Sequence, residues 1–172
     1  RVSRSRGTDG GRICAMSTDT QTLDEVAVSR WLEANLPGFA GPLEVTKFQA
    51  GQSNPTFLLS TPAHDYVLRR KPPGVLLKSA HAVDREFRVQ KALAGSQVPV
   101  AKMHLLCEDE SVIGSTFYVM DHVPGRNFND PTLPELEPKQ RAEVMDEMNG
   151  VLAALHEVDI NAIGLSDYGP PG

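Results

Sequence analysis

Residues 43–71 constrain the fold more than any other stretch, because three strand-like runs follow one another there with only short turns between them. The runs cover residues 43–48, 56–60 and 66–70 and are rich in β-branched, aromatic and other apolar side chains. Consecutive strands joined by so few residues pair antiparallel, since a parallel pair needs a crossover of about a dozen residues or more. Pro72 and Pro73 end the third run, because proline cannot donate to a sheet ladder. The sequence therefore predicts an antiparallel meander.

The turn between the first two runs is unusually small and polar. Gly51 has no Cβ, so the backbone N–H groups of such a loop can approach an anion closely. The side chains of Ser53 and Asn54 add hydrogen-bond donors, and Arg69 on the third run supplies a fixed cation. A phosphate cradle beside one positive side chain is what a nucleoside triphosphate needs. The candidate loop residues are Ala50, Gly51, Gln52, Ser53, Asn54 and Thr56.

Three helices and two more strands are predicted around this meander. A hydroxyl and an acid with capping-box spacing begin a helix over residues 22–35. A serine begins a second helix over residues 79–94, and a proline suits the first turn of a third over residues 138–157. Residues 103–107 and 116–121 are two further strands, joined by an acidic turn. The predicted fold class is α+β, with about five antiparallel strands. The expected first residues of the helices are Thr22, Ser79 and Pro138.

Two interpretations of Glu86 remain open from the residues alone. It lies in the middle of the second predicted helix, near Arg85 and Arg88, and can be a solvated acid on an exposed face. Alternatively, it pairs with Arg69 and fixes the direction of that side chain toward a phosphate.

The third predicted helix carries an apolar face that we expect to be buried. Met145 and Met148 on this face are expected to fill a core rather than to contact a cofactor. His156 ends the helix, where a cation is favourable; a catalytic histidine is the alternative. The residues that follow have no regular pattern and offer the face few partners, which indicates a chain that stops early. The face also contains Val144, Val151, Leu152 and Leu155.

Composition argues against several classes of function. The net charge of −5 over 172 residues disfavours a nucleic-acid partner, since neutralising phosphates needs a basic face. No apolar run is long enough to span a membrane. Cys14 and Cys107 lie far apart and fit no metal-ligand spacing, which favours reduced thiols in a cytoplasmic protein.

The first residues differ in composition from the rest of the chain. Residues 1–15 carry four arginines against one aspartate and have no apolar core, so they are no secretory signal. Met16 precedes an ordinary polar segment and is the expected natural start. Residues 1–15 are therefore predicted to be a disordered extension or upstream read-through, with a basic targeting arm as the alternative. The disordered N-terminal extension as a whole is expected to cover residues 1–21.

In this order the elements resemble the N-terminal lobe of the protein-kinase-like fold, and in detail the aminoglycoside phosphotransferase family. The most similar branch occurs as bacterial stand-alone phosphotransferases and fused to acyl-CoA dehydrogenases. The resemblance implies an N-lobe over residues 22–123, then a hinge and the start of a truncated C-lobe over residues 124–172. It rests on AGQSNPTF at 50–57, YVLRRKPPG at 66–74, DREFRVQKAL at 84–93, FYVMDHVPGR at 117–126 and LAALHEVD at 152–159.

The resemblance also implies roles for the candidate residues. The loop from Ala50 to Thr56 would cover the phosphates. Arg69 stands where kinases place the strand lysine, and its guanidinium can still hold α- and β-phosphates in a bidentate manner. Glu86 matches the helix glutamate that pairs with that cation. The implied cofactors are ATP, with GTP as the alternative nucleotide, and Mg²⁺.

Residues Met120, Asp121 and Val123 match the hinge, whose backbone would hydrogen-bond the adenine through Asp121 and Val123. The family's catalytic loop begins with a histidine–glycine–aspartate string, and no such string occurs in residues 159–172. The catalytic base and the Mg²⁺ ligands are therefore expected beyond Gly172, with no catalytic or metal residue in this chain. The chain alone is predicted to be inactive.

The expected function is that of an ATP-dependent phosphotransferase acting on a hydroxyl group, represented here by its nucleotide-binding lobe. The alternative is a non-catalytic, pseudokinase-like nucleotide-binding or scaffolding module. The expected partners are a nucleotide and a small-molecule hydroxyl substrate, with fusion to or association with an acyl-CoA dehydrogenase.

Overall fold

The computed structural model describes residues 23–48, 54–72 and 82–169. They form one five-stranded antiparallel sheet and three helices, an α+β arrangement as the sequence predicts. In chain order the elements are α1 (Glu25–Asn35), β1 (Glu44–Lys47), β2 (Thr56–Ser60), β3 (Asp65–Arg70), α2 (Val83–Leu93), β4 (Met103–Cys107), β5 (Phe117–Asp121) and α3 (Pro138–His156).

The sheet has the strand order β1-β2-β3-β5-β4, with every neighbouring pair antiparallel. Strands β1 to β3 form the predicted meander. The last strand in sequence, β5, is inserted between β3 and β4, so the chain that follows β5 leaves from the middle of the sheet. The two strand positions that matter most for the site, Arg69 on β3 and Tyr118 on β5, are direct cross-strand partners.

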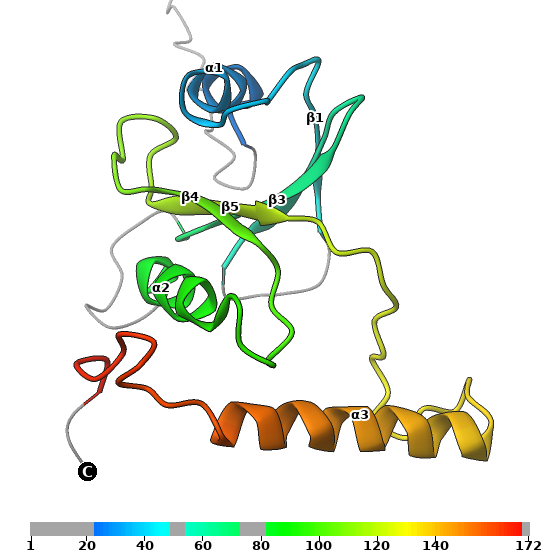
Figure 1. Ribbon diagram of the computed structural model, residues 1–172. Helices are drawn as coiled ribbons and strands as arrows, with labels where there is room; N and C mark the ends of the chain where they lie inside the picture. Colours follow the sequence, from blue (N-terminus) through cyan, green and yellow to red (C-terminus); the bar gives the residue numbers. More distant parts are fainter. Residues whose placement is uncertain (1–22, 49–53, 73–81, 170–172) are drawn as a thin grey trace, which may run out of the picture.

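Two helices cover opposite faces of the sheet (Figure 1). The face toward α1 packs the main apolar core, in which Leu32 of the helix meets Leu68 and Val119 of the strands. The face toward α2 packs a second, smaller cluster around Phe87 and Tyr118. Because strand side chains alternate between faces, β5 contributes Val119 to the main core and Tyr118 to the smaller cluster. Strands β3 and β5 are buried along most of their length.

Helices α1 and α2 begin later than the sequence predicts. Helix α1 begins at Glu25, and Asp24 caps it by accepting a hydrogen bond of 3.0 Å from the backbone N–H of Ala27. Helix α2 begins at Val83, after an N-cap residue, Ala82, that makes no side-chain cap bond. For α1 the sequence contains two residues able to cap the helix, Thr22 and Asp24, and local spacing does not decide between them. The expected caps Thr22 and Ser79 lie outside the described residues.

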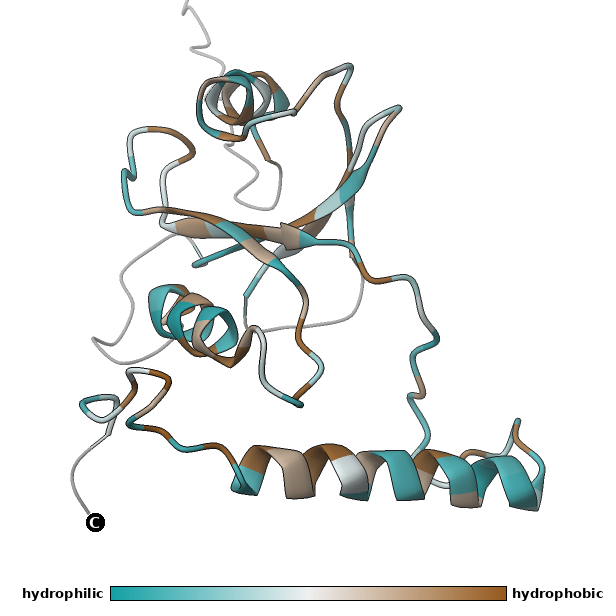
Figure 2. Cartoon of the chain, viewed as in Figure 1, coloured by the Kyte–Doolittle hydropathy of each residue, from teal (hydrophilic) through white to brown (hydrophobic). Residues whose placement is uncertain are grey.

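Helix α3 has the predicted length, but its apolar face is exposed, which corrects the expectation of burial. Met145 is 43% exposed and Met148 61%, and no residue of the helix is buried. Figure 2 shows hydrophobic and polar positions alternating along α3. In Figure 1 the helix lies apart from the sheet. Within the described residues no other helix or strand packs closely on α3. Amphipathic spacing identifies the apolar face of a helix but does not say what covers it.

None of the helices in the described part of the chain has the length and apolarity that crossing a bilayer requires.

Candidate functional site

Glu86 on α2 is the centre of a hydrogen-bonded cluster on one face of the sheet. Its Oε2 accepts a bond of 2.8 Å from Nε of Arg69 and one of 3.1 Å from the hydroxyl of Tyr118. Its Oε1 accepts a bond of 2.9 Å from Nδ2 of Asn54. Of the two interpretations that the sequence left open, the ion pair with Arg69 is therefore the one that the structure contains.

The register of the sheet brings the partners of Glu86 together. Thr56 on β2, Arg69 on β3 and Tyr118 on β5 are direct cross-strand neighbours, so their side chains project from the same face. That face is covered by α2, which presents Glu86 to all of them. The next residue, Arg70, points to the other face, where its guanidinium lies 5.7 Å from the centre of the Phe57 ring. The strand alternation thus decides which of two adjacent arginines joins the cluster.

The guanidinium of Arg69 is held at two points. Besides the Nε bond to Glu86, its Nη1 donates to Oγ1 of Thr56 at 3.2 Å. A guanidinium has five N–H donors, so these two bonds leave three that can meet the oxygens of an anion. The side chains of Arg69 and Glu86 are 29% and 35% exposed, so the pair lies at the edge of the core, where a ligand from solvent can reach it.

Tyr118 is a member of this cluster that sequence reasoning missed. It is almost fully buried, and burial, reinforced by the negative charge of Glu86, raises the pKa of its phenol to about 12. A neutral phenol that donates to the carboxylate helps to hold Glu86 in place. The sequence marks Tyr118 only as an apolar strand residue, because its contact with Glu86 depends on β5 lying next to β3.

The predicted phosphate loop is described only in part. Asn54 is 3% exposed and its amide donates to Glu86, so this side chain helps to hold the glutamate in place. Its contact with a phosphate stays a prediction. Thr56 accepts from Arg69 and donates to the carbonyl of Asn54 at 3.0 Å. The other loop candidates, Ala50, Gly51, Gln52 and Ser53, lie outside the described residues.

The predicted hinge begins where β5 ends, at Asp121. The backbone N–H of Asp121 already donates to the carbonyl of Lys102 at 2.9 Å. Of the backbone groups of Asp121, only the carbonyl therefore remains for a hydrogen bond with an adenine. Met120 packs against the smaller apolar cluster, and Val123 is 66% exposed. Contacts of these residues with an adenine stay a prediction.

The chain matches the model of the phosphotransferase enzyme family over residues 44–172. It is 47% identical over 147 residues to acyl-CoA dehydrogenase family member 11 of Rattus norvegicus, covering 83% of this chain and 19% of that protein. It is 44% identical over 154 residues to acyl-CoA dehydrogenase family member 10 of Mus musculus, covering 89% of this chain and 14% of that protein.

A solved structure is similar as well. The crystal structure of a "putative aminoglycoside phosphotransferase" from Ralstonia eutropha superposes with a TM-score of 0.75 at 53% identity, covering 88% of this chain and 43% of that one. The chain thus spans less than half of the crystallised relative and about a fifth or less of the two mammalian ones. These matches agree with the family resemblance that the sequence segments indicate.

Proposed function

This chain belongs to the phosphotransferase enzyme family, and on that basis we propose that it supplies the nucleotide-binding lobe of an ATP-dependent phosphotransferase. The proposed reaction transfers the γ-phosphate to a hydroxyl group of a small molecule. The observation that carries the proposal is the Arg69–Glu86 ion pair, held from three strands and a helix at the edge of the core.

The pair suits the binding of a polyphosphate. Glu86 holds Nε of Arg69 and Thr56 holds Nη1, so the guanidinium is oriented before a ligand arrives. A preoriented cation loses less conformational entropy on binding, and its planar donors match two phosphate oxygens at once. In phosphoryl transfer most catalysis comes from positioning and from electrostatic stabilisation, which is the contribution that this lobe can make.

The carboxylate of Glu86 is a poor candidate for holding Mg²⁺, because it already accepts hydrogen bonds from Arg69, Asn54 and Tyr118. The family's histidine–glycine–aspartate string is absent from the 172 residues. We therefore assign no Mg²⁺ ligand of the transfer reaction and no catalytic base to this chain, and expect the chain alone to bind nucleotide without transferring phosphate.

The names of the relatives support one further element of the proposal. Both mammalian relatives are called acyl-CoA dehydrogenase family members, and the matched region is a small part of each. We propose that the lobe works fused to, or in association with, an acyl-CoA dehydrogenase. The buried free thiol of Cys107 is in keeping with a reducing, cytoplasmic location.

The test combines binding and turnover. Magnesium-ATP at a hundred times its dissociation constant is expected to stabilise the folded protein by about 2.7 kcal/mol, measured by thermal melting, with GTP run in parallel. The Glu86→Gln variant is expected to show a smaller shift. The full-length protein that carries this chain is then incubated with labelled ATP and hydroxylated acceptors. A melting shift without any phosphate transfer by the full-length protein would favour the non-catalytic module, and no shift at all would contradict nucleotide binding.

A further inference from the structure

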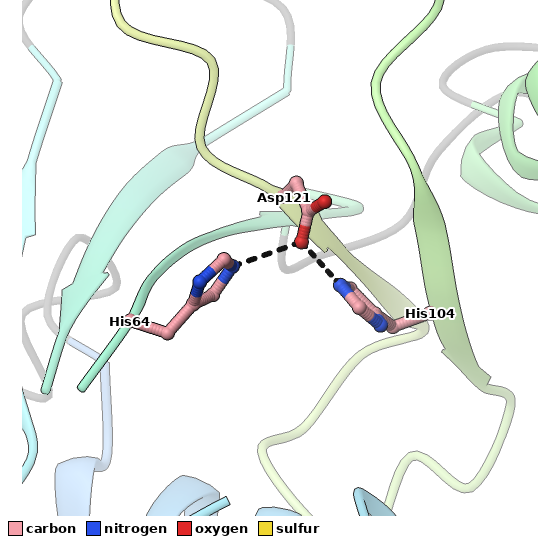
Figure 3. Close-up of side chains that lie close together, drawn as sticks. All are labelled: His64, His104 and Asp121. Carbon is pink, nitrogen blue, oxygen red and sulfur yellow. Dashed lines mark hydrogen bonds and ion pairs between the residues drawn. The ribbon is translucent and has the colours of Figure 1, made fainter. Parts of the chain in front are cut away.

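We propose that His64, His104 and Asp121 form a binding site for a zinc-type divalent cation beside the hinge (Figure 3). One ligand atom from each of the three residues lies within 4.8 Å of the other two. Nε2 of His64 is 3.0 Å from Oδ1 of Asp121, and Nε2 of His104 is 2.5 Å from the same oxygen. Both imidazoles therefore point at one carboxylate from two different elements.

Three separate features of the fold direct these side chains to one point. His104 sits on β4 at the register irregularity between Met103 and Leu105, where the regular pairing with β5 is interrupted. Such irregularities re-aim a side chain relative to its neighbours, here toward the last residue of β5, Asp121. His64 lies in the turn before β3, and that turn is closed by two hydrogen bonds between the hydroxyl of Thr61 and the backbone of His64 and by a third from the Thr61 N–H to the His64 carbonyl.

The ring of Tyr66 packs against both imidazoles of the cluster. Its ring centre lies 4.5 Å from that of His64 and 5.4 Å from that of His104, and its backbone position is the cross-strand partner of Asp121. The tyrosine is 8% exposed and belongs to the main core, so it restricts the rotation of both imidazoles. Ligands whose rotamers are limited by packing form a more precise metal site than free surface side chains do.

The donor set matches zinc-type chemistry. Two imidazole nitrogens and one carboxylate oxygen are ligands that zinc takes in proteins, and three protein ligands leave a fourth position for water. Zinc at ~2.0–2.1 Å from each ligand needs ligand atoms ~3.3 Å apart, which small side-chain rotations can supply here. On binding, each Nε2 gives its lone pair to the metal, and any proton on that nitrogen moves to Nδ1 or to solvent. A hard ion such as Mg²⁺ prefers oxygen ligands and is not expected at this site.

The exposure of the three side chains leaves an entry path. The side chain of His104 is 13% exposed and that of Asp121 26%, whereas that of His64 is 47% exposed. A hydrated ion can therefore reach the site from the side of His64.

The site is separate from the Glu86 cluster. Tyr66 and Asp121 are cross-strand partners on the α1 face of the sheet, whereas Arg69 and Tyr118 project from the α2 face. A metal here would join the turn before β3, strand β4 and the end of β5, from which the hinge departs. We therefore assign it a role in fixing the hinge rather than in binding phosphate.

The test is zinc titration by calorimetry of the full-length protein that carries this chain, stripped of metal and kept free of nucleotide. The parent is expected to bind one equivalent more than His64→Gln, and Asp121→Asn is expected to lower the affinity by ~10-fold or more. Co²⁺ used as a probe is expected to give the visible absorption of a four-coordinate site in the parent only. The matched control is His156→Gln, an exposed histidine at the end of α3, which should keep the full stoichiometry.

Because His64 lies in an exposed turn, the His64→Gln variant is expected to fold, and circular dichroism checks this. A second readout is the rise in melting temperature on adding zinc, expected for the parent and the His156→Gln control but not for His64→Gln. If the parent takes up no zinc, or if the parent and the His64→Gln, Asp121→Asn double variant take up the same amount, the three side chains form a hydrogen-bonded network only and the proposal is wrong.

Discussion

Nε of Arg69 lies 2.8 Å from Oε2 of Glu86, although Arg69 is on strand β3 and Glu86 is on the following helix, α2. The pair joins the middle of the sheet to the helix that covers it. Its position at the edge of the core, with the two side chains 29% and 35% exposed, is the reason for proposing it as the contact of an anionic ligand.

The first prediction concerns which of two positive side chains, Arg69 on β3 or Lys71 just after it, contributes more to nucleotide binding. Arg69→Ala is expected to weaken nucleotide affinity about tenfold to a hundredfold, since a hydrogen bond to a charged group contributes about 1.5–3 kcal/mol. Lys71→Ala is the matched control, because alternation places position 71 on the same face as Arg69 but two residues farther along the chain. Calorimetric titration with nucleotide measures both. Equal losses would mean that Arg69 is not the residue that meets the phosphates.

A second prediction follows from the raised pKa of Tyr118, about 12 against the usual 10. Because the folded protein favours the neutral phenol, this group contributes stability that is fully present below pH 10 and is lost as the pH rises toward 12. The free energy of unfolding is therefore expected to fall over this range, and less steeply in Tyr118→Phe. Urea unfolding at several alkaline pH values measures the difference. Parallel curves for the two proteins would show that Tyr118 does not titrate in this way.

A third prediction tests the cap of α1. Asp24→Ala removes the acceptor for the Ala27 N–H and is expected to cost about 1 kcal/mol of stability. Asp24→Asn keeps a side-chain oxygen at the same place and should lose much less. Chemical unfolding measures the stability of the two variants. An equal loss of stability in both would show that the negative charge of Asp24, rather than its hydrogen bond to the Ala27 N–H, stabilises the helix.

A fourth prediction compares a buried leucine with an exposed one. Leu68 on β3 is fully buried between α1 and the sheet, so Leu68→Ala is expected to cost about 2–5 kcal/mol. Leu152 on α3 is 50% exposed, so in this chain Leu152→Ala should change stability by less than about 0.5 kcal/mol. A large loss from Leu152→Ala would show that the apolar face of α3 is covered in solution.

Local sequence determined the elements and their order. The runs that form β2 and β4 have the predicted bounds, and the others differ by a few residues at their ends, because propensity, alternation and turn residues act over short distances. The polar turn, the strand arginine and the helix glutamate could likewise be picked out. The ion pair between them was one of two interpretations until the resemblance to a family favoured it.

The tertiary structure decided which residues far apart in the sequence become neighbours. Strand β5 is inserted between β3 and β4, and this non-local pairing places Tyr118 beside Arg69 and Asp121 beside Tyr66. No local pattern encodes such a neighbour, since it depends on which distant strand completes the sheet. The same holds for the meeting of His64, His104 and Asp121, and for the exposure of α3, whose sequence specifies an apolar face but not a partner to cover it.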